Sequence, residues 1–368
     1  MIKSFSVTCF KNFKDTCTID FANARDYDFN RQFIKNGLIN KALLYGKNGS
    51  GKSNLGFAIM DLTTHLIGNT RGANHYLSPL NGDSDKSAIQ FQYVFQFGES
   101  EIIYEYEKDE ELFLSNEQIR KNGELVFAYD YQTNNLESKL KEVSTLSKQA
   151  LLNRNIENSV LKTIYRISAR LIEDSPIKLI YEFAKGMLRF GSLDDYALMK
   201  NDMSIEKVEQ YIASDSKKMD DFSLFLDRCG LHYDMQTMSL FTDKYIYVKF
   251  KNRSYPLFQI ASIGTKVLSL FFYWLDKMKG KITFLYLDDY DAFYHFSLAK
   301  TILQIINEND SYQSIITTNN PYLADNAIMR PDCYLNLKDG KVKSFADSTN
   351  RIIRQGNSLE KMVLTDAF

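Results

Sequence analysis

Alternating apolar and polar residues mark the first third of the chain as β-structure. The alternation covers residues 2–8, 17–21, 88–97 and 101–107, and short strands with a turn at residues 121–123 continue it to residue 130. A period of two residues is typical of strands that bury one face. We therefore expect antiparallel strands here, separated by a loop over residues 63–87 that contains His65 and His75, most simply as solvated or structural histidines.

Helical spacing replaces the alternation from about residue 137 to residue 232. Apolar residues such as Leu146, Val160 and Ile164 recur every three or four positions, as on an amphipathic helix. The spacing also predicts helices over residues 176–189 and 204–229. Strand-like alternation returns over residues 238–250 and 253–259.

Almost wholly apolar runs predict strands that are buried on both faces, at residues 41–45, 282–287 and 314–318. Helical segments lie between them, and a last strand pair is expected over residues 333–345. Buried strands that alternate with helices indicate a parallel α/β core. The changes of pattern divide the chain into an N-terminal part, a helical insertion and a C-terminal part, at residues 1–135, 136–236 and 237–368.

Composition narrows the function classes. The 368 residues carry a net charge of −1, which gives no global electrostatic case for nucleic acid or an anionic membrane as partner. The four cysteines are scattered, which argues against a zinc site or a disulfide framework and fits a reducing cytoplasm. The N-terminus alternates like a strand rather than a signal peptide, and no apolar run approaches ~18 residues, so we expect no membrane span.

The motif G-x-x-x-x-G-K-[ST] occurs between the apolar run 41–45 and a helical segment at residues 54–62. Strand, glycine-rich loop and helix are the context that a phosphate-binding P-loop requires, whereas a chance glycine-rich turn has no such context. Backbone N–H groups and the helix N-terminus would hold the phosphates of ATP. The predicted nucleotide-binding residues are Gly46, Lys47, Asn48, Gly49, Ser50, Gly51, Lys52, Ser53 and Asn54.

Within this loop, Lys52 would reach the β- and γ-phosphates and Ser53 would ligate Mg²⁺. The apolar strand at residues 282–287 runs into Asp288 and Asp289, as expected for the strand that delivers carboxylates to the metal. Asp288 would hold Mg²⁺ and Asp289 would orient the attacking water. Without the P-loop, two acidic residues there would indicate only a solvated strand end.

Asn319 follows the apolar strand at residues 314–318 and is a candidate sensor of the γ-phosphate, since its amide donates a hydrogen bond without carrying charge. The alternative is an Asn-Asn-Pro turn.

These motifs, in this order, resemble the ABC-type ATPases of the SMC/RecF/OLD group, and in particular the stand-alone bacterial AAA-family ATPases of anti-phage defence systems. The opening with Asn12, Phe13 and Lys14, the loop form G-x-N-G-x-G-K-S, and the tail at residues 358–362 carry the resemblance. Residues 262–265 match the S-x-G-T signature, and residues 287–295 match L-D-E-x-D-A-x-x-H. The resemblance implies an ABC-type P-loop ATPase head with an antiparallel β subdomain and a helical insertion.

The resemblance also implies a homodimer, or a higher oligomer, in which two heads sandwich ATP. The signature residues Ser262, Gly264 and Thr265 of one copy would close over the nucleotide bound by another. A separately encoded effector, a nuclease or a toxin, is the implied partner, because no nuclease motif is visible in this chain.

Two residues depart from the family pattern: Asp289 replaces the catalytic Glu and Asn319 replaces the switch His. Displacing a catalytic group by about 1 Å can slow a reaction by roughly 10²-fold, so we expect weak hydrolysis. The Q-loop glutamine stays open among Gln90, Gln92 and Gln118.

The first functional hypothesis is therefore an ATP-dependent switch or scaffold in a defence system. The alternative is a RecF-like DNA-repair ATPase. Lys244, Lys249, Lys251 and Arg253 cluster on one predicted hairpin and could face DNA, but a solvated hairpin explains them equally well.

Overall fold

The computed structural model describes residues 1–68, 78–140, 143, 159–167, 173–191, 205–241 and 243–368. The chain forms two compact units. The first comprises Met1–Arg189, Thr283–Tyr286 and Asp310–Phe368, and the second comprises Phe190–Ile282 and Leu287–Asn309. Each unit is described by itself below.

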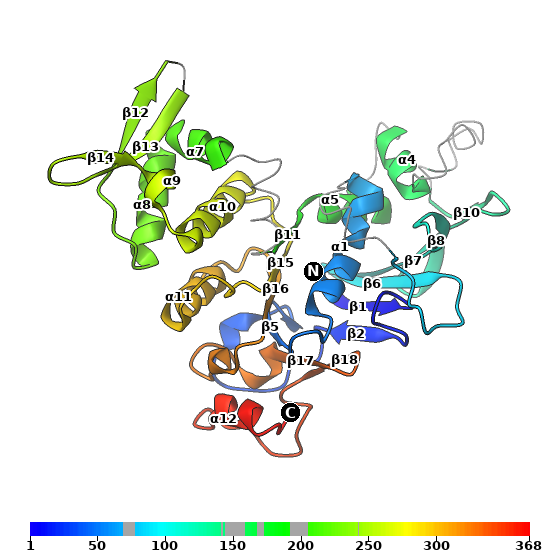
Figure 1. Ribbon diagram of the computed structural model, residues 1–368. Coiled ribbons are helices and arrows are strands. Elements are labelled where there is room, and N and C mark those ends of the chain that lie inside the picture. The colour runs from blue at the N-terminus through cyan, green and yellow to red at the C-terminus, as the bar shows by residue number, and fades with distance from the viewer. Residues whose placement is uncertain (69–77, 141–142, 144–158, 168–172, 192–204, 242) are drawn as a thin grey trace. The chain divides into compact units, whose positions relative to one another are not determined.

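A seven-stranded antiparallel sheet forms one layer of the first unit, in the order β10-β9-β8-β7-β6-β1-β2 (Figure 1). Its buried face is aromatic because the alternating positions of β6 and β7 carry Phe91, Tyr93, Tyr104 and Tyr106. The predicted antiparallel strands are confirmed. Their bounds are β1 Ile2–Thr8, β2 Cys17–Asp20, β6 Ile89–Phe97, β7 Ser100–Lys108, β8 Leu114–Lys121, β9 Glu124–Asp130 and β10 Asn135–Ser138.

A second sheet has the order β11-β15-β16-β5-β17-β18. β5 pairs in parallel with both β16 and β17, and β18 pairs antiparallel with β17, so the sheet is mixed. The predicted α/β core is therefore confirmed. The bounds are β5 Lys41–Tyr45, β11 Met187–Gly191, β15 Phe284–Asp288, β16 Gln313–Thr318, β17 Tyr334–Lys338 and β18 Lys341–Ser344; β3 Ile34–Lys35 and β4 Leu38–Ile39 form a separate pair.

Helix α1 (Lys52–Ile67) packs against the antiparallel sheet, and the hydroxyl of Tyr93 on β6 donates to the Ala58 and Ile59 carbonyls at 3.1 Å each. The same helix is almost wholly buried, which explains its apolar sequence. The other helices of the first unit are α4 Val160–Ile167, α5 Pro176–Lys185 and α12 Leu359–Leu364, with 3-10 turns η1 Arg31–Phe33, η3 Pro321–Leu323 and η4 Pro331–Cys333.

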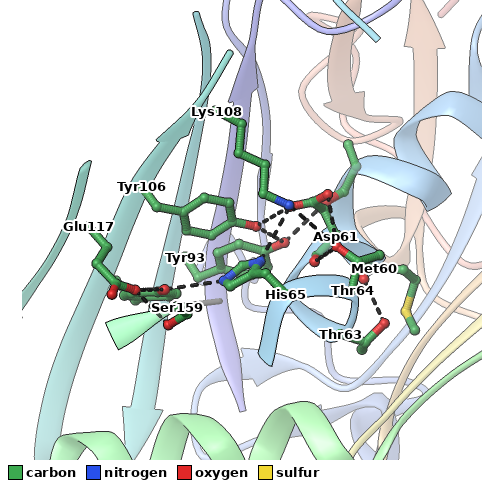
Figure 2. Close-up of polar contacts among 12 residues, drawn as sticks. Met60, Asp61, Thr63, Thr64, His65, Tyr93, Tyr106, Lys108, Glu117 and Ser159 are labelled. Atoms are coloured by element: carbon green, nitrogen blue, oxygen red, sulfur yellow. Dashed lines mark hydrogen bonds and ion pairs between the residues drawn. The ribbon is translucent and has the colours of Figure 1, made fainter. Parts of the chain in front are cut away.

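A buried polar cluster ties the second half of α1 to the sheet (Figure 2). The fully buried Asp61 pairs with Lys108 on β7 at 2.7 Å and accepts from the Tyr106 hydroxyl at 2.9 Å. Burial by itself would raise the pKa of Asp61, but the charge of Lys108 and contacts with His65 outweigh it, so this pKa lies well below its ordinary value. A buried ion pair is thereby built into the helix that follows the P-loop.

The cluster continues to α4. His65 Nε2 lies 3.2 Å from the Tyr104 hydroxyl, which donates to Glu117 on β8 at 2.8 Å. Glu117 in turn accepts from the Ser159 hydroxyl at 2.8 Å and from the backbone N–H of Val160 at 2.6 Å. A carboxylate thus satisfies the free N–H groups at the start of α4.

The second unit combines a three-stranded antiparallel sheet, β12-β13-β14, with helices (Figure 1). Phe222 and Phe225 of α8 pack their rings on Phe272 of α10, at centroid distances of 5.2 and 5.5 Å. The bounds are α7 Ile205–Ala213, α8 Ser216–Arg228, β12 Met235–Leu240, β13 Asp243–Lys249, β14 Ser254–Pro256, α9 Leu257–Ile260, α10 Ile263–Lys277 and α11 Phe296–Asn307.

Two element boundaries expected in the first unit were wrong. The residues predicted to begin a loop at residue 63 are still helical, because Leu62 and Leu66 are buried and α1 continues to Ile67, where Gly68 is the C-cap with φ 79°. His65 is consequently a buried helical residue, while His75 lies outside the described residues. The helix predicted over residues 176–189 ends at Lys185, and the following residues form the edge strand β11.

The strand predicted over residues 238–250 is in fact a hairpin: β12 and β13 pair with Leu240 opposite Asp243, and Phe241 adopts φ 57° in the turn. The strand predicted over residues 253–259 stops at Pro256, after which α9 begins. Leu146 lies outside the described residues, whereas Val160 and Ile164 are buried on α4.

The unit boundaries differ from the expected breaks at residues 135/136 and 236/237. α4 and α5 belong to the first unit and α7 and α8 to the second, and much of the remaining stretch between residues 136 and 236 is outside the described residues. The three-part division stays a prediction. In the described part of the chain, no helix is both long and apolar enough to cross a membrane.

Candidate functional site

The P-loop connects the end of β5 to the start of α1. Gly49 and Gly51 adopt φ 78° and 103°, a region that residues with a Cβ atom rarely occupy. The Ser50 N–H donates to the Lys47 carbonyl at 3.1 Å, and the Gly46 N–H donates to the Thr318 carbonyl of β16 at 3.3 Å. The loop therefore curls tightly and is tied to the neighbouring strand.

Gly46 leaves room for the Ser50 side chain. A Cβ atom on Gly46 would lie 2.5 Å from Ser50 Oγ and 3.3 Å from the Leu337 carbonyl, so a side chain here would displace the Ser50 hydroxyl. Ser50 Oγ is enclosed and has no hydrogen-bond partner among the described residues. Because buried polar atoms are normally partnered, this hydroxyl is fitted to a polar ligand in the loop.

Lys52 points its ammonium group back into the loop. Its side chain is only 5% exposed, and Nζ donates to the Gly46 carbonyl at 2.8 Å and to the Lys47 carbonyl at 3.4 Å. The next residue, Ser53, is half-buried in the first turn of α1. An ammonium group beside helix N–H groups and an unpartnered hydroxyl is a donor set that suits a phosphate.

Polar side chains surround the loop within the first unit. The Asn319 amide, just after β16, donates to Asn48 Oδ1 at 2.5 Å, so the candidate γ-phosphate sensor contacts the P-loop directly. Lys47, in contrast, forms an exposed ion pair with Asp366 at 3.2 Å. Asn54 reaches the turn between β1 and β2, where its amide donates to Asn12 Oδ1 at 2.7 Å.

The predicted carboxylates lie at the end of β15, in the second unit. Asp288 is its last residue and is 3% exposed. Asp289 adopts φ 42°, and its carbonyl accepts from the Ala292 N–H at 3.1 Å. A positive φ at a residue other than glycine often marks a functional position, and Asp tolerates it better than most.

The signature residues begin helix α10, also in the second unit. Ser262 is the N-cap, and its exposed hydroxyl accepts from the Thr265 N–H at 3.2 Å. A Cβ atom on Gly264 would lie 3.1 Å from the Phe293 carbonyl, so this glycine permits close packing. The Thr265 side chain is 2% exposed and contacts the hydroxyls of Ser262 and Tyr233 at 3.0 and 3.4 Å.

The three candidate Q-loop glutamines all lie inside strands. Gln90 and Gln92 on β6 donate to Glu107 and Glu105, at 2.7 and 2.5 Å, and Gln118 on β8 donates to Glu105 at 2.5 Å. These side-chain hydrogen bonds join neighbouring strands across the polar face of the antiparallel sheet. None of the three glutamines lies in a loop, and the Q-loop residue stays unassigned.

Tyr286 on β15 was not predicted to matter for the site. Its hydroxyl donates to the Lys52 carbonyl at 2.6 Å, and its ring occupies the space beside Gly56, where a Cβ atom would lie 2.4 Å away. An apolar strand with a tyrosine gives no sequence signal for this contact. Gly56, a glycine inside a helical pattern, was the feature of the sequence that could have indicated the close approach of another segment.

A solved SMC head shares this fold. The chain aligns with the SMC head bound to the C-winged helix domain of ScpA at 15% identity and a TM-score of 0.51, covering 93% of this chain and 97% of that chain. The SMC head domain from Thermotoga maritima has 16% identity and a TM-score of 0.45 over 93% of this chain and 97% of that one. An SMC head from Pyrococcus furiosus bound to the C-terminal domain of ScpA has 14% identity and a TM-score of 0.46, over 99% and 98%.

No protein of curated function matches the chain in sequence. A family model described as "AAA domain, putative AbiEii toxin, Type IV TA system" matches residues 41–325, from the P-loop strand to beyond Asn319. With the SMC-head fold and the P-loop geometry, this match over most of the chain confirms the expected SMC/ABC-type ATPase: the chain belongs to this AAA domain family.

Proposed function

We propose that the chain binds ATP with Mg²⁺ at the P-loop and works as a nucleotide-dependent switch. The observation that carries this proposal is that the buried Lys52 ammonium and the enclosed, unpartnered Ser50 hydroxyl belong to the same loop, in which Gly46 leaves room for the Ser50 side chain. Such a site is fitted to an anion.

Each site residue has a proposed role. Lys52 contacts the β- and γ-phosphates, and the oxygens of Ser53 and Asp288 are ligands of the type that Mg²⁺ prefers. Asp289 orients the attacking water, and Asn319 donates to the γ-phosphate. The bound metal would neutralise phosphate charge, while the short Asp289 and the neutral Asn319 favour slow hydrolysis.

A second copy would complete the site. Ser262 and Gly264 lie at the N-terminus of α10, an exposed position that attracts anions, and we place them against the nucleotide of the other copy. The resulting homodimer, or a higher oligomer built from it, would respond to ATP.

The switch would act in bacterial anti-phage defence and control a separately encoded nuclease or toxin. The family description, with its toxin and Type IV TA system, supports this setting. An SMC head of similar fold that carries a domain of ScpA provides an example of a head with a separate protein partner.

The direct test is the Lys52→Ala variant. Isothermal titration calorimetry with Mg·ATP should show at least roughly 100-fold weaker binding, because removing one partner of a buried charged contact costs about 3 kcal/mol or more. The exposed Lys139→Ala serves as the matched control and should bind like the wild type. Equal ATP affinity of a folded Lys52→Ala variant would contradict the proposal.

A further inference from the structure

We propose that Asn12 is a positioning residue of the P-loop; this inference rests on the proposed nucleotide binding. Asn12 lies in the turn between β1 and β2, far from the loop in sequence. Its Nδ2 donates to the Ser50 carbonyl at 3.3 Å, while its Oδ1 accepts from Asn54 Nδ2 at 2.7 Å. One amide therefore links the last turn of the phosphate loop to the first turn of helix α1.

The same side chain fills the space beside Gly51. A Cβ atom on Gly51 would lie 2.3 Å from Asn12 Nδ2 and 2.8 Å from Oδ1. Gly51 adopts φ 103°, so both its backbone conformation and its surroundings require glycine. The backbone thus passes from the loop into helix α1 directly against the Asn12 amide. The position of the loop therefore depends on the position of this amide.

The turn that carries Asn12 is itself fixed. Phe10 and Phe13 are buried and exchange two backbone hydrogen bonds, of 3.0 and 2.8 Å. The Lys11 N–H donates to the Pro79 carbonyl at 2.7 Å, and its carbonyl accepts from Asn81 Nδ2 at 2.5 Å. A side chain anchored by such a turn can hold the loop in one geometry, as a binding site requires.

The two hydrogen bonds require an amide side chain at residue 12. Asn12 must donate to one partner and accept from the other, which Asn can do at once without adding charge. Asp would still accept from Asn54 but could not donate to the Ser50 carbonyl, and it would place a negative charge next to the bound phosphates. Because Asn12 contacts the loop rather than the proposed ligand, its effect on the nucleotide is indirect.

The test is a double-variant cycle measured by calorimetry with Mg·ATP, together with the melting temperature of each protein without nucleotide. Asn12→Ala and Asn54→Ala should each weaken ATP binding about 10-fold, the effect of roughly one hydrogen bond, and the double variant should be no weaker than the worse single variant. Asn12→Asp should bind at least as weakly as Asn12→Ala. Asp15→Ala, an exposed change in the same turn, is the matched control and should bind like the wild type.

The melting temperatures should stay close to that of Asp15→Ala, since a purely structural role of Asn12 would lower stability without coupling to Asn54 in ATP affinity. If Asn12→Ala fails to fold, Asn54→Ala removes the same contact from the helix side. Wild-type ATP affinity in Asn12→Ala, or independent effects of the two changes, would overturn the inference alone. A folded wild-type protein that binds no ATP would overturn the proposed function as well.

Discussion

At the scale of single residues, Asp61 is a charged side chain that folding removes completely from water. It is fully buried on α1, and contacts with Lys108, His65, Tyr106 and the Thr64 hydroxyl compensate for its removal from water. Burial and the Lys108 charge lower the pKa of His65, which favours its neutral ring and leaves Lys108 as the cation beside Asp61.

Replacing Lys108 with Met should therefore destabilise the protein by about 3–5 kcal/mol, because Asp61 would remain as a buried carboxylate without its cation. Urea unfolding followed by circular dichroism measures the change. The double variant Asp61→Asn with Lys108→Met should recover much of the loss, since Asn still accepts from Tyr106. Lys139→Met, which breaks an exposed pair, should change stability by less than about 1 kcal/mol, and a Lys108→Met protein as stable as this control would refute the argument.

We expect the rate of ATP hydrolysis to depend on Asp289 and Asn319. The substitutions Asp289→Glu and Asn319→His together should raise kcat by about 10- to 100-fold and change ATP affinity only a few-fold, as expected for contacts made mainly in the transition state. A steady-state phosphate-release assay, with calorimetry for affinity, measures both.

Asp289 adopts φ 42°, which Asp tolerates better than Glu, so the melting temperature of the variant must be compared with the wild type. Wild-type turnover near the ~10 s⁻¹ typical of enzymes, with a slower double variant, would mean that the two residues are matched to each other for hydrolysis.

Among the elements, α1 is the part that the rest of the first unit holds in place. Tyr93 and Lys108 contact it from the antiparallel sheet, and Tyr286 contacts it from β15. Gly56 allows the last contact because the Tyr286 ring lies where a side chain would be. The helix that begins at Lys52 is thus positioned along its whole length.

The change Gly56→Ala should consequently destabilise the protein by about 1–3 kcal/mol through overpacking, although Ala favours a helix by about 1 kcal/mol over Gly. Chemical denaturation measures this effect. Gly82→Ala is the control, because nothing lies within 4 Å of a Cβ atom there. Combining Gly56→Ala with Tyr286→Leu should cost less than the two single changes added together; strict additivity would show that the ring is not the cause.

For the whole molecule, the division of the candidate residues between two units is the main feature. Lys52, Ser53 and Asn319 belong to the first unit, and Asp289 and Ser262 to the second. We expect ATP to drive self-association through Ser262 and Gly264, as proposed above.

Sedimentation velocity with ATP and Mg²⁺ should show this association in the wild type and its loss in Ser262→Asp, because the added charge would repel phosphate. Asp remains a good N-cap, so α10 should be preserved. Ser262→Asn is the neutral control of nearly equal size and should associate more strongly than Ser262→Asp. ATP-dependent assembly that is the same in both variants and in Gly264→Asp would exclude the signature from the interface.

The sequence alone determined the strands of the large antiparallel sheet, the α/β core and the P-loop, because each depends on a local pattern: alternation, an apolar run, or glycines at fixed spacing before a lysine. Contacts between segments distant in the chain decided the features that local patterns do not specify, such as where an element ends and which side chains meet. Burial against the sheet lengthened α1 and made His65 a core residue, and pairing at a sheet edge turned the segment after Gly186 into β11. The amide of Asn12 and the ring of Tyr286 reach the P-loop and α1 only because folding brings the first hairpin and β15 beside them, and no spacing in the sequence encodes that proximity.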